Sequence, residues 1–311
     1  MKQKDTDSMV QTHVKKVKED PNYRYTYVIA EIGINHNGDF ETAKMIIAAA
    51  YHAGAAAVKF QHRNLDQIYT EKILADPNSA EWNFEYIVPI LKNTQLTLSE
   101  LTELSDYAWS SNLDFIVTPF DEIAAFQCAV NLKVDALKIG SMDMVNYDLI
   151  TKCAQYDIPM IISTGMWTEK EIRSSVKIFN DLNIDYFLLL ANSTYPTPYE
   201  SINLEFLHTL REIHPYVGYS GHERGTFVPV AAAALGARIV EKHITLDRTQ
   251  EGPDHKASME PEEFRDMVTH LRKLQKALGS EKRVNMAEQL AKQTFVRGSY
   301  AKTDLPVGHE L

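Results

Sequence analysis

The chain has 311 residues, of which 44% are hydrophobic and 10% aromatic, which is enough for a packed core and excludes a globally disordered protein. Its formal net charge is −10, so we expect no nucleic-acid partner, because a phosphate backbone is bound by a basic surface. The two cysteines, Cys128 and Cys153, lack metal-site spacing and indicate reduced residues of a cytoplasmic protein. No apolar run approaches the roughly eighteen residues of a membrane span.

Residues 1–25 are rich in charge and contain no apolar signal core. We therefore expect this segment to be a solvated, charged N-terminal arm. The absence of a targeting signal in it is the basis for expecting a cytoplasmic location without membrane association.

From Tyr27 onward, short and continuously hydrophobic runs follow one another with amphipathic segments between them. Such runs are typical of parallel strands that are covered by helices on the outside. The expected strands are residues 27–33, 55–61, 114–120, 136–141, 159–165, 186–193, 216–221 and 238–245. The expected helices are residues 39–54, 98–111, 121–132, 147–156, 168–183, 203–213, 226–236 and 260–278, and a long polar connection follows the second strand.

Eight strand–helix units within residues 26–280 predict an α/β fold of the (β/α)8 TIM-barrel type. A doubly wound sheet is the rival fold, but it usually has fewer strands, and no G-x-G-x-x-G follows the first expected strand. Residues 281–311 differ in character and predict a linker and two short strands, the incomplete start of a small β-domain.

Nearly every expected strand delivers a polar side chain at its carboxyl end, where barrels carry their active sites. His222 and His243 follow neighbouring strands and predict a divalent-metal site, since neutral imidazole is a common metal ligand. Lys59 and Lys138, with the strand-end serines and threonines, predict a cradle for phosphate or carboxylate oxygens. Glu31 suits acid–base chemistry or the activation of a water.

Each of these residues, taken singly, also has a structural explanation. A serine or threonine after a strand is usually a helix N-cap, and either lysine could be an ion-pair partner. His36 and His255 are expected to be structural. The concentration of polar groups at one end of the barrel favours a functional site, because packing alone does not require it.

Nine motifs in this order resemble the N-acetylneuraminate (sialic acid) synthase family, and together they span roughly residues 27–278. They are IAEIGINHNGD, AVKFQ, VTPF, LKIGS, ISTGM, STYPTPY, GYSGHERG, VEKHITLDR and GPDHKAS. The resemblance implies condensation of phosphoenolpyruvate with an N-acylated mannosamine-type sugar, which releases phosphate and gives a nine-carbon 2-keto acid. An unphosphorylated sugar such as N-acetylmannosamine is the preferred acceptor, because no extra arginine cluster is evident. Two other kinds of acceptor stay open: the 6-phosphate of N-acetylmannosamine and the 2,4-diacetamido sugars of legionaminate and pseudaminate synthases. The role of a spore-coat polysaccharide synthase homologue also stays open.

The resemblance also implies roles for individual residues. His222 and His243 would hold a divalent ion, typically manganese, with magnesium or cobalt as alternatives, and Glu31 would be the acid–base residue. The positions that match phosphoenolpyruvate-binding residues are Lys59, Thr118, Lys138, Ser141, Ser163, Ser193 and Ser220. The positions that match sugar-binding residues are Gln61, Asp143, Tyr195 and Asp254.

Two features depart from the family pattern. Met142 follows Ser141, where the family usually has a small residue. Family members also carry an antifreeze-like (SAF) domain that is swapped across a homodimer and contributes an arginine to the partner's sugar site. Residues 295–311 resemble the start of that domain, and the sequence ends before the arginine. The resemblance still implies a homodimer.

Two other functions are compatible with the same residues. An aldolase would form a Schiff base on Lys138 or Lys59. A non-catalytic homologue would bind the ligand without turning it over.

Overall fold

The computed structural model describes residues 7–79 and 84–310 and contains a closed barrel of eight parallel strands. The strands are paired in chain order, and β1 pairs with β8 to close the barrel. The strands are β1 (Tyr27–Gly33), β2 (Ala57–His62), β3 (Asp114–Pro119), β4 (Ala136–Ile139), β5 (Met160–Ser163), β6 (Tyr186–Ala191), β7 (Val217–Gly221) and β8 (Ile239–His243). The predicted TIM barrel is confirmed.

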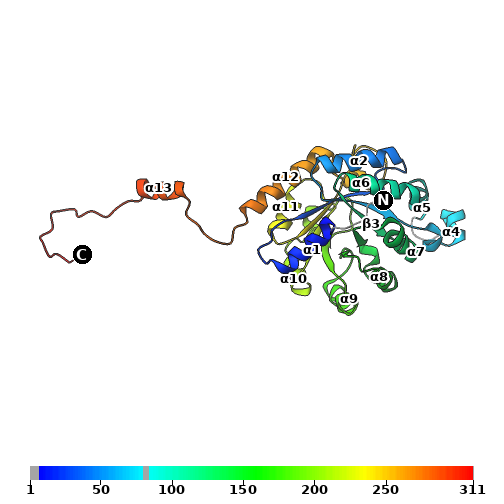
Figure 1. Ribbon diagram of the computed structural model, residues 1–311, viewed down its shortest axis with the longest axis horizontal. Helices are drawn as coiled ribbons and strands as arrows, with labels where there is room; N and C mark the ends of the chain where they lie inside the picture. Colours follow the sequence, from blue (N-terminus) through cyan, green and yellow to red (C-terminus); the bar gives the residue numbers. More distant parts are fainter. Residues whose placement is uncertain (1–6, 80–83, 311) are drawn as a thin grey trace. The chain divides into compact units, whose positions relative to one another are not determined.

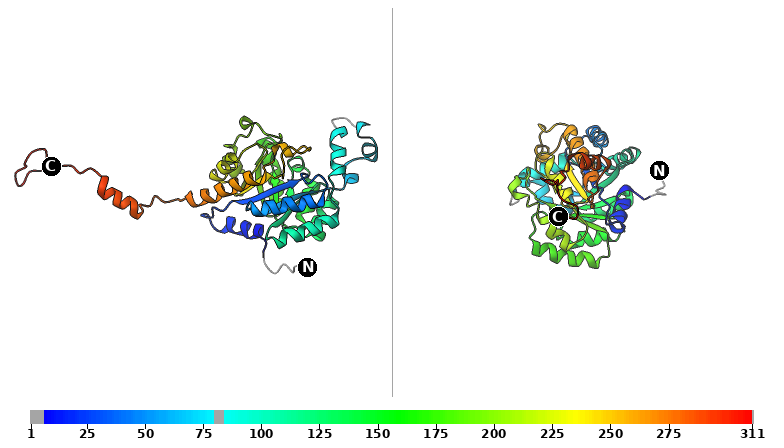
Figure 2. Two further views of the ribbon diagram at one scale, coloured as in Figure 1. Left: turned by 90° about the horizontal axis from the view of Figure 1, so that it is seen from above. Right: turned by 90° about the vertical axis from the view of Figure 1, so that its left-hand side faces the viewer.

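Helices surround the barrel (Figures 1 and 2) and connect successive strands. They are α2 (Phe40–His52), α6 (Leu98–Ser110), α7 (Glu122–Phe126), the π-helix η2 (Gln127–Leu132), α8 (Tyr147–Ala154), α9 (Glu169–Asp181), α10 (Phe206–Ile213), α11 (Phe227–Ala234) and α12 (Pro261–Ala277). Several begin at a side-chain cap: Asp39 accepts from the backbone of Thr42 at the start of α2. Capping boxes start α6 at Thr97 and α9 at Thr168.

The interior of the barrel contains an apolar layer beneath a polar one. Because side chains alternate along a strand, a residue two positions beyond an inward-facing one also faces inward. The lower layer includes Ile29, Ala57, Ile116, Ala136, Ile161 and Ile239. Two residues further along the same strands lie Glu31, Lys59, Thr118, Lys138, Ser163 and Glu241, all buried. The strand register therefore places the polar groups together above an apolar base.

The solvated arm expected at the N-terminus is wrong for residues 9–19, which form the helix α1 (Met9–Glu19). Val10 and Val14, one helical turn apart, pack into the apolar layer inside the barrel. The backbone N–H groups of Met9 and Val10 donate to the carboxylate of Asp114 at 3.1 and 2.6 Å. Two valines are a weak hydrophobic signal among many charged residues, and the helix was therefore not predicted. Residues 1–6 of the expected arm lie outside the described part.

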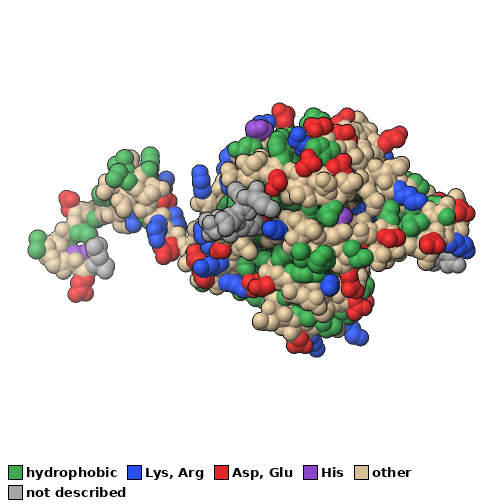
Figure 3. Space-filling model, turned by 45° about the vertical axis from the view of Figure 1, so that its right-hand side comes forward, with side chains coloured by type: hydrophobic (Ala, Val, Ile, Leu, Met, Phe, Trp, Pro, Cys, Tyr) green, Lys and Arg blue, Asp and Glu red, His purple; other side chains and the backbone are tan. Residues whose placement is uncertain are grey.

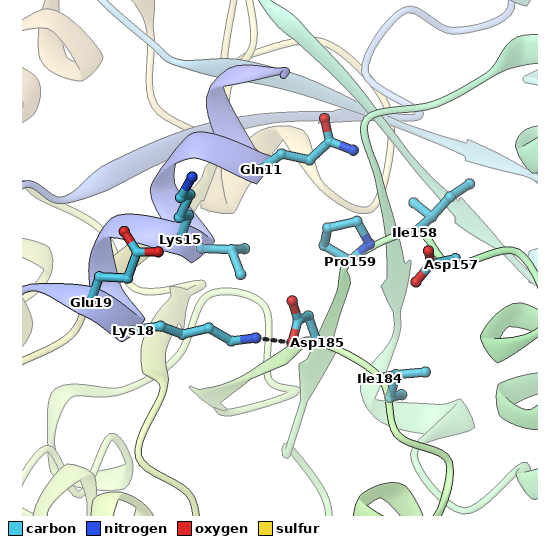
Figure 4. A pocket seen from close by; sticks show the side chains of 10 residues that line it. Gln11, Lys15, Lys18, Glu19, Asp157, Ile158, Pro159, Ile184 and Asp185 are labelled. Atoms are coloured by element: carbon cyan, nitrogen blue, oxygen red, sulfur yellow. Dashed lines mark hydrogen bonds and ion pairs between the residues drawn. The ribbon is translucent and has the colours of Figure 1, made fainter. Parts of the chain in front are cut away.

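A shallow cavity of about 350 Å³ lies between α1 and the loops that precede β5 and β6 (Figure 4). The Lys18 ammonium forms an ion pair with Asp185 across it. This contact ties the polar face of α1 to the barrel, so the helix covers the end of the barrel opposite the strand carboxyl ends.

The long connection after β2 is more regular than expected. It contains α3 (Leu65–Ile68), α4 (Glu71–Ala75), η1 (Pro77–Ser79) and α5 (Phe84–Asn93), while residues 80–83 of this connection lie outside the described part. α5 was not predicted because Pro89 lies inside it, and proline normally disfavours a helix interior. Val88 is buried, which shows how packing supports the helix.

Residues 277–311 form a separate unit from residues 1–276. This unit contains the helix α13 (Met286–Phe295), which begins with a capping box between Asn285 and Glu288. The two short strands expected here do not form in the described residues of this segment, and the first part of the expected strand region belongs to α13. A strand needs a hydrogen-bonded partner, whereas a helix satisfies its backbone locally.

Acidic and basic side chains are interspersed on the barrel face that Figure 3 shows. Across the described residues, we find no helix with both the length and the apolarity needed to span a membrane.

Candidate active site

Two lysines and two glutamates form an ion-pair network at the carboxyl ends of the strands. The Lys59 Nζ atom lies 3.0 Å from Glu31 Oε2 and 3.3 Å from Glu241 Oε1. The Lys138 Nζ atom lies 4.0 Å from Glu241 Oε1. All four side chains are at most 5% exposed. Pairing is what allows these charges to be buried, since an unpaired buried charge is strongly destabilising.

The four groups of the network differ in how burial and neighbouring charges shift their pKa values. Burial raises the pKa of Glu31, and the charge of Lys59 only partly offsets this effect. Burial would likewise raise the pKa of Glu241, but Lys138 and Lys59 outweigh it and lower that pKa. Burial lowers the pKa of Lys138 to about 8. Burial also acts to lower the pKa of Lys59, but Glu241 and Glu31 together raise it. Lys59 is thus the more firmly protonated of the two lysines.

Hydroxyl groups surround both ammonium groups. Lys59 donates to Thr118 Oγ1 at 3.2 Å, and Lys138 donates to Ser163 Oγ at 2.7 Å. A single cavity of about 670 Å³ opens over this network. It is lined by all seven residues expected to bind phosphoenolpyruvate: Lys59, Thr118, Lys138, Ser141, Ser163, Ser193 and Ser220. Clustered ammonium and hydroxyl donors suit the oxygens of a phosphate or carboxylate.

The two histidines expected to bind a metal lie side by side in this cavity, with ring centres 5.5 Å apart. His222 Nδ1 lies 2.6 Å from the backbone oxygen of Asn192, so Nδ1 carries the proton and Nε2 keeps a free lone pair. Burial lowers the pKa of His222 to about 4 and lowers the pKa of His243 well below its usual value. Both imidazoles are therefore neutral at physiological pH, as metal ligands must be.

A divalent ion fits this pair of histidines. His243 Nδ1 is buried, has no hydrogen-bond partner, and lies 3.8 Å from Asp254 Oδ2. Within the described parts of the chain, no group of three or more His, Cys, Asp or Glu side chains is arranged to hold a metal. The protein can therefore offer two imidazole ligands here.

Three of the four residues expected to bind the sugar line the same cavity, namely Gln61, Tyr195 and Asp254. The Tyr195 ring lies 4.0 Å from the His222 ring, measured between centres. Burial, followed by the charge of Glu31, raises the pKa of Asp254 to about 7. Asp143 is not among the lining residues and instead accepts a hydrogen bond from Asn146 at 3.1 Å. Met142 lines the cavity and is 61% exposed.

Sequence reasoning missed several residues of the cavity. Glu241 was given no role from the sequence, although it lies within ion-pair distance of both lysines. Arg63 was not considered, yet it follows Lys59 and Gln61 at the two-residue interval of inward-facing side chains. The outer wall comes from the helical connection after β2 and comprises Ile68, Tyr69, Tyr86, Ile87 and Leu91. That wall could not be foreseen without the helices that carry it.

A TIM barrel with buried lysines, hydroxyls and paired histidines at the strand carboxyl ends defines an enzyme-type site for an anionic substrate. Residues 46–283 match the NeuB family. The N,N'-diacetyllegionaminic acid synthase of Legionella pneumophila is 37% identical over 297 residues, which cover 92% of this chain and 82% of that protein. The chain belongs to the NeuB family, whose members are synthases that condense phosphoenolpyruvate with a sugar.

Two further comparisons agree with this assignment. The N-acetylneuraminate-9-phosphate synthase of Mus musculus is 34% identical over 290 residues, covering 92% of this chain and 80% of that protein. The crystal structure of the N-acetylneuraminic acid synthetase from Leptospira borgpetersenii, determined with citrate, has a TM-score of 0.77 and 32% identity. The likeness covers 88% of this chain and 92% of that one. The predicted family resemblance is confirmed.

Proposed function

We propose that this protein is a nonulosonate synthase that joins phosphoenolpyruvate to an N-acyl mannosamine-type sugar and releases phosphate. N-acetylmannosamine is the acceptor that we favour. The observation that supports this proposal is one cavity in which two lysines and several hydroxyls lie beside two neutral histidines. The related legionaminic, pseudaminic and N-acetylneuraminate-9-phosphate synthases support the same reaction class.

In the proposed reaction, Lys59 and Lys138 with their hydroxyl partners hold the phosphate and carboxylate oxygens of phosphoenolpyruvate. The C3 carbon of phosphoenolpyruvate attacks the sugar aldehyde, a C–C bond forms, and the aldehyde oxygen takes a proton. Water then adds to C2, and the C2–O bond to phosphate breaks to leave a 2-keto acid. Of the two protons of this water, one balances the proton taken by the aldehyde oxygen and the other leaves with the phosphate. Glu31, whose pKa is raised by burial, would accept a proton from this water.

His222 and His243 would hold the divalent ion, for which manganese is the leading candidate. When bound, such an ion supplies Lewis-acid polarisation of the sugar aldehyde. Buried lysines and fixed hydroxyls stabilise negative charge as it develops, without reorganising. A homodimer, which the family resemblance implies, and the cytoplasmic location expected from the sequence complete the proposal.

The test is release of inorganic phosphate from phosphoenolpyruvate with Mn²⁺ present. Three acceptors are compared: N-acetylmannosamine, its 6-phosphate and a 2,4-diacetamido-trideoxy sugar. We expect release to require one acceptor and to stop with EDTA, while Glu31→Gln binds phosphoenolpyruvate without turnover. Absence of release with every acceptor would contradict the synthase and favour a binding homologue.

Borohydride trapping separates the synthase from a Schiff-base aldolase. The lowered pKa of Lys138, about 8 because of burial, makes it the lysine on which an imine would form. We expect no covalent adduct after borohydride treatment with pyruvate, because the proposed reaction needs no imine. An adduct on Lys138 would favour the aldolase.

A further inference from the structure

Arg63 is a partly buried cation of the active-site cavity to which no role has been given above. It follows β2 directly, and its guanidinium group lies 4.2 Å from the centre of the Phe120 ring. This short cation–π distance shows that the guanidinium group is held against the Phe120 ring. Burial lowers the pKa of Arg63 to about 10, which leaves the side chain charged at neutral pH.

Arg63 determines which way the Gln61 amide faces. An Nη atom of Arg63 donates to Gln61 Oε1, and a guanidinium group can only donate. The amide nitrogen of Gln61 must therefore face the opposite direction, where it donates to Glu31 Oε1 at 3.2 Å. Without Arg63, the amide could rotate and place its oxygen against the Glu31 carboxylate.

Within residues 7–79 and 84–310, the remaining N–H groups of Arg63 have no acidic side chain as partner. Lys59 and Lys138 have Glu31 and Glu241 as ion-pair partners. By contrast, no carboxylate in residues 7–79 or 84–310 lies within ion-pair distance of Arg63. The Arg63 side chain donates a hydrogen bond to the side chain of Gln61. A guanidinium group has five N–H donors, so several are available to a ligand.

The contacts of Arg63 place it on one side of the cavity. Its hydrogen-bond partner Gln61 converges with Glu31 and Asp254 on Gly33, where a Cβ atom would lie 3.2 Å from Gln61 Nε2, 3.1 Å from Glu31 Oε1 and 3.3 Å from Asp254 Oδ2. Lys138 and Ser163, at the deep end of the cradle, contact each other and not Arg63. Arg63 thus belongs with Gln61 and Asp254, on the side assigned to the acceptor sugar.

We propose that Arg63 is a specificity-determining residue of the acceptor-sugar subsite. It holds the Gln61 amide in the orientation that donates to Glu31, and it gives its remaining N–H groups to an oxygen of the sugar. This inference rests on the proposed synthase function. The oxygen could belong to a hydroxyl or carbonyl group or to a sugar phosphate, and the test below separates these sources.

The first experiment compares Arg63→Met and Arg63→Lys with wild type, using phosphate release to measure KM for each substrate. We expect Arg63→Met to raise the KM of the sugar at least tenfold and to leave the KM of phosphoenolpyruvate within twofold. Arg63→Lys keeps the charge without the planar fork, so the sugar KM should rise less. Arg173→Met, which removes an exposed arginine of α9 paired with Glu169, is the control and should leave both values unchanged.

Two results would overturn the inference: a rise in the KM of phosphoenolpyruvate alone, or no change in either KM. Failure of wild type to release phosphate would instead count against the synthase function, so the two failures are distinguishable. If Arg63→Met does not fold, judged by circular dichroism, the Arg63→Lys comparison decides, and an unchanged sugar KM in it overturns the proposal.

Two further comparisons test the details. Because Arg63 and Gln61 act together, Arg63→Met should raise the sugar KM much less in a Gln61→Met background than in wild type. If the two substitutions raise the sugar KM by independent factors that multiply, Arg63 does not act by positioning Gln61. Binding of N-acetylmannosamine and of its 6-phosphate, measured by calorimetry, identifies the oxygen: a loss of affinity confined to the 6-phosphate indicates a phosphate oxygen, whereas equal losses with both sugars indicate a hydroxyl or carbonyl oxygen.

Discussion

Gly33, at the end of β1, occupies the point where three polar side chains of the cavity converge. A Cβ atom on Gly33 would lie 3.1 Å from Glu31 Oε1, 3.2 Å from Gln61 Nε2 and 3.3 Å from Asp254 Oδ2. Its φ of +55° is also a left-handed conformation that favours glycine. The absence of a side chain at residue 33 therefore lets Glu31, Gln61 and Asp254 approach one another.

We expect Gly33→Ala to lower kcat at least tenfold, because the added methyl group displaces Glu31 and Gln61 from each other. The left-handed backbone should add a loss of stability of about 1 kcal/mol. Steady-state phosphate release and thermal unfolding measure the two effects. Gly54→Ala is the matched control: Gly54 is also left-handed, with φ +85°, but its Cβ would meet the Val268 side chain. It should destabilise the protein and spare kcat, and wild-type turnover in Gly33→Ala would contradict this account.

The residues that could be predicted most directly from the sequence are those fixed by strand register, whereas Ser193, Tyr195 and Asp254, beyond the strand ends, were assigned to the cavity by the family resemblance. Glu31, Lys59 and Lys138 follow apolar residues by two positions, so a correct strand assignment already places them at the barrel mouth. Asp143 and Arg63 lie beyond strand ends, where backbone direction depends on loop conformation. For this reason the position of Asp143 was predicted wrongly, since it does not line the cavity. Arg63, which does line it, was not predicted.

At the scale of single elements, α1 shows how a few residues fix a helix that composition does not predict. His13 of α1 is 2% exposed and is surrounded by the rings of Tyr23, Tyr25, Tyr27 and Phe187. Burial lowers its pKa to about 3. In the unfolded chain a histidine titrates near 6.5, so folding keeps His13 neutral where the unfolded chain would protonate it.

Stability should therefore be lost as the pH falls below about 6.5, because protons bind the unfolded state preferentially. His13 contributes a slope of about 1.4 kcal/mol per pH unit in the range between the two pKa values. Asp114 opposes this trend, since burial raises its pKa to about 6 and its stabilising contribution is lost as the pH rises through that value. Only a comparison of variants isolates His13.

We expect His13→Leu to be less sensitive to acid than wild type. Between pH 6.5 and 5, its free energy of unfolding should gain about 2 kcal/mol relative to wild type. Urea unfolding at the two pH values measures the difference. His208→Leu, which changes a histidine of α10 that is 53% exposed, should show no such gain. Parallel pH dependence of His13→Leu and wild type would show that His13 is not buried as described.

The eight strands and the helices between them were predictable because long, strongly periodic segments leave little choice of structure. α1 and α5 were not, for different physical reasons. α1 has two buried valines in a charged segment, so its docking depends on the hydrogen bonds to Asp114. α5 contains Pro89, and its formation depends on burial of Val88. Tertiary contacts decide both cases.

At the scale of the whole molecule, the chain consists of the barrel unit, residues 1–276, and the unit of residues 277–311. The strands of the barrel are almost completely buried and are joined in a closed ring without edges. The single helix of the second unit, α13, has no buried residue in the structure. The two units should therefore differ in local stability.

We expect amide hydrogens to exchange much faster in α13 than in α1, although the two helices contain 10 and 11 residues and both begin with a capping box. An isolated helix of this length is marginal in water because its nucleation is unfavourable, so the amides of residues 289–295 should exchange within seconds. α1 packs Val10 and Val14 into the barrel, so its amides should be protected for at least a hundredfold longer. Exchange followed by mass spectrometry at neutral pH measures both segments in one sample, with β2 as the fully protected reference. Equal protection of the two helices would show that α13 is packed against other protein in solution.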